Sequence, residues 1–326
     1  MNYMIDRIHK IRIAWMLVLL LLWVTGCRAV PAQGSLETPT RTANQTPRPT
    51  VRSTKRSTLT PTWTLQPSKA PALPTRTAAS PPSPSPRAVI APILLYHHVS
   101  DQGSGRYVVA VDNFRRQMET LEEGGYQTVT ISQVAAAVRG EAALPERAVA
   151  ITFDDGYLDT YENAFPILRE LGFKATLYVI TGTLETDKSY GYLQDEALKE
   201  LIDAGWEIGS HSVTHTNLKT TWLGIRSELE QSKETLEERL GIEVSSFSYP
   251  FGITNDWIKA RVPEHGYTSA VGLDILNVHT PRQQFFLSRR EVLGGTSLSG
   301  FKSLLEPGKA DLEILNTATS TPTAQP

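Results

Sequence analysis

Apolar and polar residues alternate along residues 89–292 in a pattern that predicts strands followed by helices. Continuous apolar runs bounded by turn residues indicate buried strands, and apolar residues three or four positions apart indicate helices with one buried face. Repeated β-then-α units with short loops imply parallel strands covered by helices, either in a barrel or in a doubly wound sheet. The expected strands are Val89–Tyr96, Ala148–Phe153, Ala175–Ile180, Trp206–Gly209, Ser246–Tyr249, Thr268–Val271 and Phe286–Val292. The expected helices are a segment capped by Asp112, Ser132–Val138, Leu158–Leu171, Asp195–Ala204 and Trp222–Leu240.

The first 27 residues have the layout of an export signal. Three basic residues, Arg7, Lys10 and Arg12, precede an apolar run at 14–24 that is short for a membrane span and suits a signal-peptide core. The run ends in VTGC, whose last residue, Cys27, is the only cysteine. This ending resembles the bacterial lipobox, which implies a lipoprotein signal peptide over 1–27 and a lipid on Cys27. The alternative is a short uncleaved anchor, and both interpretations place the body outside the cytoplasm, at the cell surface or on the periplasmic side.

Two segments lack the composition of a folded domain. From Pro31 to Arg87, 31 of 57 residues are Pro, Thr or Ser, and such a stretch cannot bury enough apolar surface to offset its chain entropy. We therefore expect a disordered linker over 28–88, a folded domain over 89–305 and a disordered tail over 306–326.

Charge is distributed unevenly along the chain. Residues 28–87 hold nine Lys and Arg and one acidic residue, whereas residues 88–326 hold 20 Lys and Arg against 32 Asp and Glu, a net charge of −12. An acidic body without a basic stripe argues against nucleic acid as the ligand. With one cysteine, the fold cannot rely on an internal disulfide.

Two adjacent carboxylates end the predicted strand Ala148–Phe153. Asp154 and Asp155 follow it directly and precede Gly156. Neighbouring carboxylates at the end of a buried strand resist joint ionisation, and a bound cation relieves that repulsion. One carboxylate then serves as a metal ligand and the other as a base, although a simple acidic turn is the alternative for this stretch taken alone.

A pair of histidines follows another predicted strand. His211 and His215 come directly after Trp206–Gly209, and an H-x3-H spacing is a common way to chelate a divalent ion. Because the chemistry of parallel α/β folds gathers at the carboxyl ends of the strands, these imidazoles are expected near Asp155. Two histidines and one carboxylate leave open positions, as a catalytic metal site requires. The alternative is a pair of polar residues that solvate a loop.

Two further polar segments lie at strand ends. His97 and His98 follow the first strand, and a histidine there can give a proton to a leaving group near neutral pH, unless it is merely packed or solvated. The segment Ser248–Gly252 is expected to form a tight turn whose exposed backbone N–H groups can bind a developing oxyanion, although taken alone it would be an ordinary turn. No phosphate loop is present, and Gly295–Gly300 lacks the spacing of a hydrolase nucleophile elbow.

Together these segments resemble the polysaccharide deacetylases, the carbohydrate esterases that carry the NodB homology domain. The resemblance covers residues 90–292 and rests on TFDDG, HSVTHTNL and SYPFG, in the family's order and spacing. The opening ILLYHHVS resembles the branch whose barrel is circularly permuted and which deacetylates extracellular N-acetylglucosamine polymers. The resemblance implies an α/β fold, a distorted (β/α) barrel of about seven strands.

The resemblance also implies roles for individual residues. Asp154 matches the family's catalytic base, and His97 matches the acid that protonates the leaving group in the permuted branch. Phe251 stands where the family supplies an oxyanion-hole backbone N–H. The family's metal ligands, which usually hold zinc and sometimes another divalent ion, correspond to Asp155, His211 and His215.

Two departures from the family pattern concern the base and the acid. Ser248 stands where the family usually has the arginine that holds the base, so we expect this partner elsewhere, at Arg289 or Arg290 in the last strand. The family's usual C-terminal histidine motif is absent, as expected if His97 has taken its place.

The resulting hypothesis is metal-dependent removal of N-acetyl groups from an extracellular amino-sugar polysaccharide, such as poly-N-acetylglucosamine, a chitin-like polymer or the peptidoglycan glycan. One alternative is an O-acetyl esterase that acts on xylan or another wall glycan. The other is an inactive glycan-binding lipoprotein, which the missing third-motif arginine favours. The expected partners are a polysaccharide and, through the lipid anchor, a membrane, and neither a protein nor a nucleic-acid partner is predicted.

Overall fold

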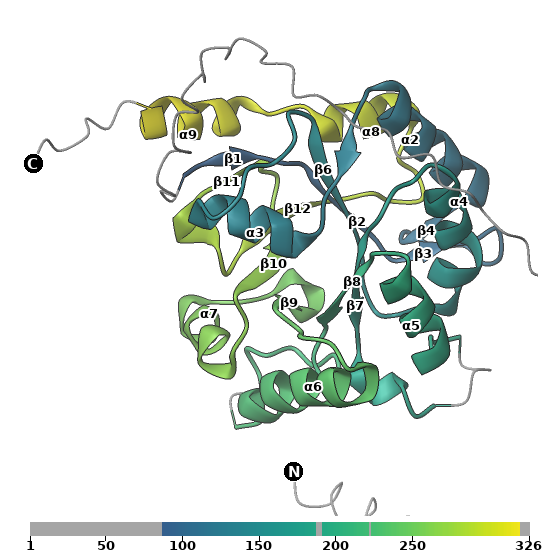
Figure 1. Ribbon diagram of the computed structural model, residues 1–326, viewed down its shortest axis with the longest axis vertical. Coiled ribbons are helices and arrows are strands. Elements are labelled where there is room, and N and C mark those ends of the chain that lie inside the picture. The colour runs from purple at the N-terminus through teal and green to yellow at the C-terminus, as the bar shows by residue number, and fades with distance from the viewer. Residues whose placement is uncertain (1–86, 187–190, 222, 320–326) are drawn as a thin grey trace, which may run out of the picture. The chain divides into compact units, whose positions relative to one another are not determined.

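Seven parallel strands close into a barrel in the computed structural model, which describes residues 87–186, 191–221 and 223–319 (Figure 1). Around the barrel the order is β2–β6–β7–β8–β9–β10–β12, and β12 pairs again with β2. This closure confirms the predicted α/β class and the seven-stranded barrel, and it excludes a doubly wound sheet. The barrel strands are β2 (Ile93–Tyr96), β6 (Ala148–Phe153), β7 (Thr176–Val179), β8 (Glu207–Ser210), β9 (Ser246–Ser248), β10 (Ser269–Leu273) and β12 (Leu287–Glu291).

Five short strands of the described residues lie outside this closed ring. The prediction of one strand over Val89–Tyr96 is wrong, because the chain breaks at Pro92, which has no N–H to donate to a ladder. The first part pairs with β11 in a separate antiparallel ribbon, and only the second part enters the barrel. The outer strands are β1 (Val89–Ile90), β3 (His98–Val99), β4 (Val108–Val109), β5 (Gln127–Thr128) and β11 (Val278–His279).

The helices pack around the outside of the strands (Figure 1). The helix expected over Leu158–Leu171 is confirmed as a continuous helical segment that ends at residue 170. Within it a π-helical turn, Thr160–Ala164, precedes α4, where Pro166 lies in the first turn. The helix expected from residue 222 begins at 225, after Gly224 as N-cap, and residue 222 lies outside the described residues. The helices are α2 (Val111–Glu123), α3 (Ile131–Arg139), α4 (Phe165–Glu170), α5 (Asp195–Asp203), α6 (Ile225–Leu240), α7 (Asp256–Arg261), α8 (Leu298–Leu305) and α9 (Lys309–Thr319).

The prediction of a disordered tail over 306–326 is wrong for its described part, which contains a helix. Residues 309–319 form α9, and Asp311 near its start is 1% exposed. Its carboxylate accepts hydrogen bonds from the backbone N–H groups of Asn277, Val278 and Gly308, all at 2.8 Å. Composition alone did not reveal this anchor. Residues 320–326, the expected signal peptide at 1–27 with Cys27, and the expected linker through residue 86 lie outside the described residues.

The two faces of β6 explain how the barrel presents polar groups at its mouth. Ile151 and Phe153 point outward into the apolar layer under the helices, where Phe153 stacks on Trp206 with ring centroids 5.6 Å apart. Because side chains alternate along a strand, Thr152 points to the barrel interior, and its hydroxyl accepts a hydrogen bond from the buried Arg289 at 3.3 Å. The barrel interior is therefore partly polar at this end.

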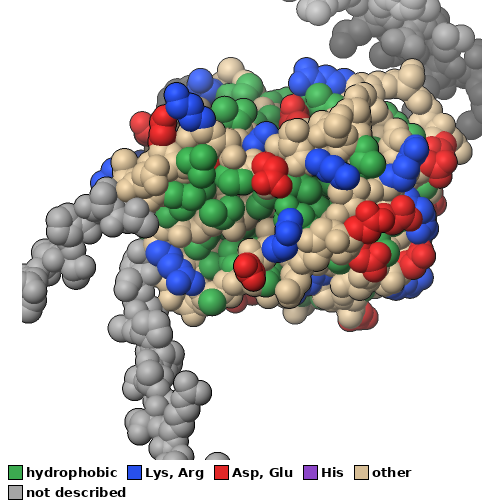
Figure 2. Space-filling model, turned by 90° about the horizontal axis from the view of Figure 1, so that it is seen from above, with side chains coloured by type: hydrophobic (Ala, Val, Ile, Leu, Met, Phe, Trp, Pro, Cys, Tyr) green, Lys and Arg blue, Asp and Glu red, His purple; other side chains and the backbone are tan. Residues whose placement is uncertain are grey.

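Two surface properties complete the description of the domain. Among the described helices, none combines the length and the apolar character needed to cross a bilayer. Figure 2 shows the face seen from above Figure 1, where apolar side chains gather between scattered acidic and basic ones. No histidine of the described residues is visible on this face.

Candidate active site

One cavity of about 320 Å³ at the carboxyl ends of the barrel strands brings most of the predicted residues together. Arg290 is the exception, because its guanidinium turns outward and donates to the carbonyl of Ile275 at 2.8 Å. Of the two arginines expected to hold the base, the structure therefore brings only Arg289 into the site. The predicted residues that line the cavity are His97, Asp154, Asp155, His211, His215, Phe251 and Arg289.

Asp155, His211 and His215 form a cluster in which one potential ligand atom from each lies within 4.8 Å of the others. Asp155 Oδ1 lies 3.4 Å from His211 Nε2 and 3.5 Å from His215 Nε2. Donor atoms placed tetrahedrally around a zinc ion at 2.0–2.2 Å lie about 3.4 Å apart. In addition, Asp155 Oδ1 is buried and accepts no hydrogen bond within the described chain. A buried carboxylate oxygen without a partner is costly, so the cluster fits a divalent cation.

The protonation of both imidazoles suits ligation. His211 Nδ1 lies 2.8 Å from the Ser248 carbonyl, which can only accept a hydrogen bond, so Nδ1 carries a proton and Nε2 is the nitrogen available to a metal ion. Burial, and next the nearby His211, lower the pKa of His215. Both effects favour the neutral imidazole that a metal ligand must be.

Asp154 is held by a buried arginine. Arg289 donates from both terminal nitrogens to the two carboxylate oxygens, each at 2.7 Å. Ser248 donates to the same carboxylate at 3.1 Å and accepts from Arg289 at 2.9 Å. Burial raises the pKa of Asp154, but the Arg289 charge, with further contributions from His211 and His97, outweighs it and holds the pKa well below its usual range. The carboxylate is therefore ionised and fixed in orientation.

Four residues of the site adopt left-handed backbone conformations. Asp155, Ser212, His215 and Phe251 have φ angles of 73°, 67°, 54° and 60°, and they are the only non-glycine residues with positive φ in the described chain. Each such residue costs about 1–2 kcal/mol relative to ordinary backbone. The strain is thus concentrated where the ligands are aimed.

His97 and Phe251 occupy the rim of the cavity. Burial lowers the pKa of His97, and the carboxylates of Asp154 and Asp155 partly offset that effect. The N–H of Phe251 finds no acceptor within the described chain, and its ring lies against His215 with centroids 4.4 Å apart. The structure thus leaves the backbone N–H of Phe251 free beside the cluster of Asp155, His211 and His215.

The sequence pointed to His98 but not to Tyr107 and Tyr157 in the cavity wall, nor to the contact between His98 and Asp159. Tyr157 and Tyr107 line its wall, and His98 stacks on Tyr157 with centroids 3.7 Å apart. Asp159 accepts a hydrogen bond from His98 Nδ1 at 2.7 Å. The segment DGYLD places Asp159 four residues after Asp155, but no pattern pointed to His98 as its partner.

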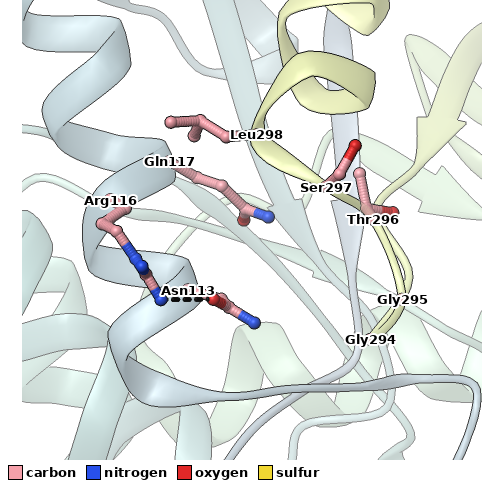
Figure 3. Close-up of a pocket in the computed structure, with 8 residues that line it drawn as sticks. All are labelled: Asn113, Arg116, Gln117, Gly294, Gly295, Thr296, Ser297 and Leu298. Atoms are coloured by element: carbon pink, nitrogen blue, oxygen red, sulfur yellow. Dashed lines mark hydrogen bonds between the residues drawn. The ribbon is translucent and has the colours of Figure 1, made fainter.

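A second hollow, of about 260 Å³, lies between α2 and the loop before α8 (Figure 3). It contains part of the Gly295–Gly300 segment. Its polar side chains mostly serve local structure, since Arg116 donates to Asn113 at 2.8 Å and Ser297 caps α8. No carboxylate or imidazole lines it, so this hollow offers no acid–base group for catalysis.

Known proteins resemble this chain in both sequence and fold. A family model described as polysaccharide deacetylase matches residues 141–270. YxkH of Bacillus subtilis, named as a polysaccharide deacetylase, is 32% identical over 222 residues, which are 67% of this chain and 77% of that protein. The poly-beta-1,6-N-acetyl-D-glucosamine N-deacetylase of Escherichia coli is 35% identical over 116 residues, 34% of this chain but only 17% of that enzyme. The solved structure of the Streptococcus pyogenes deacetylase PplD in complex with acetate matches with a TM-score of 0.63 and 26% identity, over 67% of this chain and 99% of that one.

The parallel barrel with this polar cluster at its mouth, taken with these relatives, defines a hydrolase. The chain belongs to the polysaccharide deacetylase family. Membership confirms the family predicted from the sequence motifs. The matched span contains Asp154, Asp155 and the two histidines but neither His97 nor Arg289, so the roles of these last two residues rest on the geometry of this chain.

Proposed function

We propose that this protein is a metal-dependent deacetylase that removes N-acetyl groups from an extracellular amino-sugar polysaccharide. The observation that carries the proposal is the position of the Asp155, His211 and His215 cluster in one cavity with the arginine-held carboxylate of Asp154. The E. coli and S. pyogenes relatives support the substrate class, because one is named for an N-acetylglucosamine polymer and the other is solved with acetate, the product expected of deacetylation.

Each residue has a distinct task in this proposal. Asp155, His211 and His215 would hold a divalent ion, most simply zinc, and such an ion polarises a carbonyl and lowers the pKa of water when bound. Asp154, kept ionised by Arg289, accepts the proton of the water that attacks the acetyl carbon. The Phe251 N–H donates to the oxygen that gains negative charge. His97 gives a proton to the departing sugar nitrogen, which leaves as the free amine while acetate is released.

The test is acetate release by the purified chain from N-acetylglucosamine oligomers, with and without a chelator. We expect release that stops on chelation, returns with added Zn²⁺ and is lost in Asp155→Asn. Release that persists in the chelated protein would contradict the metal role. A parallel assay on acetylated xylan identifies an O-acetyl esterase, and oligomer binding without any turnover by the metal-loaded protein identifies the inactive glycan-binding alternative. The missing third-motif arginine favours that alternative less now, because Arg289 occupies the place beside Asp154.

We also propose that the protein is anchored outside the cytoplasm by a lipid on Cys27. The support is the basic and apolar pattern before the VTGC sequence. Cells fed a labelled fatty acid should incorporate the label into the wild-type protein and not into Cys27→Ala. Equal labelling of both proteins would refute the assignment.

A further inference from the structure

We propose that Glu228 is a positioning residue that holds the histidine loop, residues 211–215, in the conformation that binds the metal ion. The sequence motifs do not point to this residue. The inference rests on the metal site of the proposed function, and it assigns to α6 a part in building that site.

Glu228 directs its carboxylate at the peptide groups between the two histidines. It lies in the first turn of α6 and is 6% exposed. Its Oε2 accepts hydrogen bonds from the backbone N–H groups of Val213 and Thr214, both at 2.9 Å, and its Oε1 accepts from the Thr214 hydroxyl at 2.7 Å. Hydrogen bonds to an ionised acceptor are stronger than neutral ones. Three of them on two consecutive residues fix both the position and the orientation of this stretch.

The backbone of the histidine loop is strained, so contacts from outside the loop must stabilise its conformation. Ser212 and His215 both have left-handed φ angles, and the loop contains no glycine to relieve them. Such conformations persist only where the surroundings impose them. The loop's carbonyl groups are held from the other side, since the N–H of Thr181 donates to Ser212 and the N–H of Gly182 donates to Val213, at 3.1 and 2.9 Å. Glu228 supplies the matching contacts to the N–H groups.

The helix that carries Glu228 is itself firmly supported. Leu229 and Leu236 of α6 are fully buried in the apolar layer. One turn after Glu228, the Ser232 hydroxyl lies 2.7 Å from that of Ser210, the residue before the loop. One face of α6 thus contacts both the residue before the histidine loop and the middle of the loop. Because Glu228 does not line the catalytic cavity, it acts through the histidines and does not touch substrate.

Residues that orient metal ligands from behind typically change metal affinity by about 10–100-fold when they are removed. The experiment measures Zn²⁺ affinity of the purified full chain by competition with a chromophoric chelator, together with the melting temperature of the metal-free protein. The variants are Glu228→Ala, which removes all three contacts, and Glu228→Gln, whose amide can still accept from the two N–H groups and donate to the Thr214 hydroxyl. Glu230→Ala is the matched control, since Glu230 lies on the same helix and pairs only at the surface with Arg226.

We expect Glu228→Ala to bind Zn²⁺ about 10–100-fold more weakly than the wild type, with Glu228→Gln close to wild type and Glu230→Ala unchanged. Unchanged affinity in Glu228→Ala, even with a lower melting temperature, would mean a purely structural role and overturn the inference. If Glu228→Ala does not fold, Thr214→Val decides the question, because it removes one of the three contacts and should still weaken binding several-fold. Failure of the proposed function looks different, since the wild type itself would then bind no Zn²⁺.

Discussion

Replacing Arg289 by Met leaves the buried carboxylate of Asp154 without its charged partner. The structure gives two charge-assisted hydrogen bonds of 2.7 Å between side chains that are 1% and 4% exposed. Removing one member of such a pair costs about 3–5 kcal/mol of unfolding free energy, which for a domain of this size lowers the melting temperature by roughly 6–20 °C. Arg290→Met is the matched control, since this neighbouring side chain only meets a surface carbonyl, and it should change stability by no more than about 0.5 kcal/mol.

The same substitution has a defined pH dependence. In the wild type the pKa of Asp154 is depressed, so its contribution to stability is present above the ordinary carboxyl pKa of about 4 and is lost only as the pH falls further. In Arg289→Met, burial acts without opposition from Arg289 and raises that pKa, so the penalty is full at neutral pH and shrinks as the pH falls. Denaturant unfolding at pH 7.5 and pH 5 should therefore show the two proteins converging, and the acid limb of kcat/KM should move to higher pH in the variant. Equal stability of Arg289→Met and Arg290→Met at pH 7.5 would refute the reasoning.

Three more outcomes can be measured. His97→Asn should lower kcat about 10²–10⁴-fold, and a kcat near wild type excludes the acid role. Because the proposed acid must be protonated and burial lowers its pKa below the ordinary value, wild-type kcat/KM should already decline as the pH rises toward about 6.5. Gly182→Ala puts a Cβ 2.6 Å from the Val213 carbonyl oxygen, so it should displace the histidine loop and weaken Zn²⁺ binding. Gly295→Ala is the control, because the added Cβ meets open space, and this variant should bind Zn²⁺ as the wild type does. Burial lowers the pKa of His279 to about 4, so the unfolded chain takes up a proton between pH 6.5 and 4 that the folded protein does not. The free energy of unfolding should therefore fall by up to about 3 kcal/mol as the pH is lowered across this window. His279→Gln should lose that pH dependence in denaturant titrations, and an unchanged dependence of stability on pH would show that other groups cause it.

The cluster of Asp155, His211 and His215 could be predicted because its signals are local. Two local patterns predict polar groups at strand ends: a strand that ends in two carboxylates, and a strand followed by H-x3-H. The parallel topology then places these ends together. The partner of Asp154 could be narrowed only to Arg289 or Arg290. Strand alternation requires that one points inward and the other outward, but the sequence does not say where the alternation begins.

The parts that escaped prediction depend on single contacts between distant segments. Glu228 is one of several acidic residues on α6, and nothing local distinguishes it until the helix is packed behind the histidine loop. The same holds for α9, whose Thr- and Pro-containing surroundings suggested disorder, while one buried carboxylate at Asp311 ties it to the segment at 277–278. Amino-acid composition averages over many residues, so it does not reveal that a single buried carboxylate can hold a helix in place.

The closing strand β12 gives the barrel a late point of assembly. Asp154 and Arg289 are separated by 135 positions in the chain, and β12 pairs with β2, which is made almost 200 residues earlier. During synthesis, Asp154 therefore emerges long before Arg289, its partner near the end of the chain. Long-range pairings of this kind form slowly. Barrel closure and the pairing of Asp154 with Arg289 are then one event, so a chain that stops before β12 should have neither a stable fold nor the proposed activity.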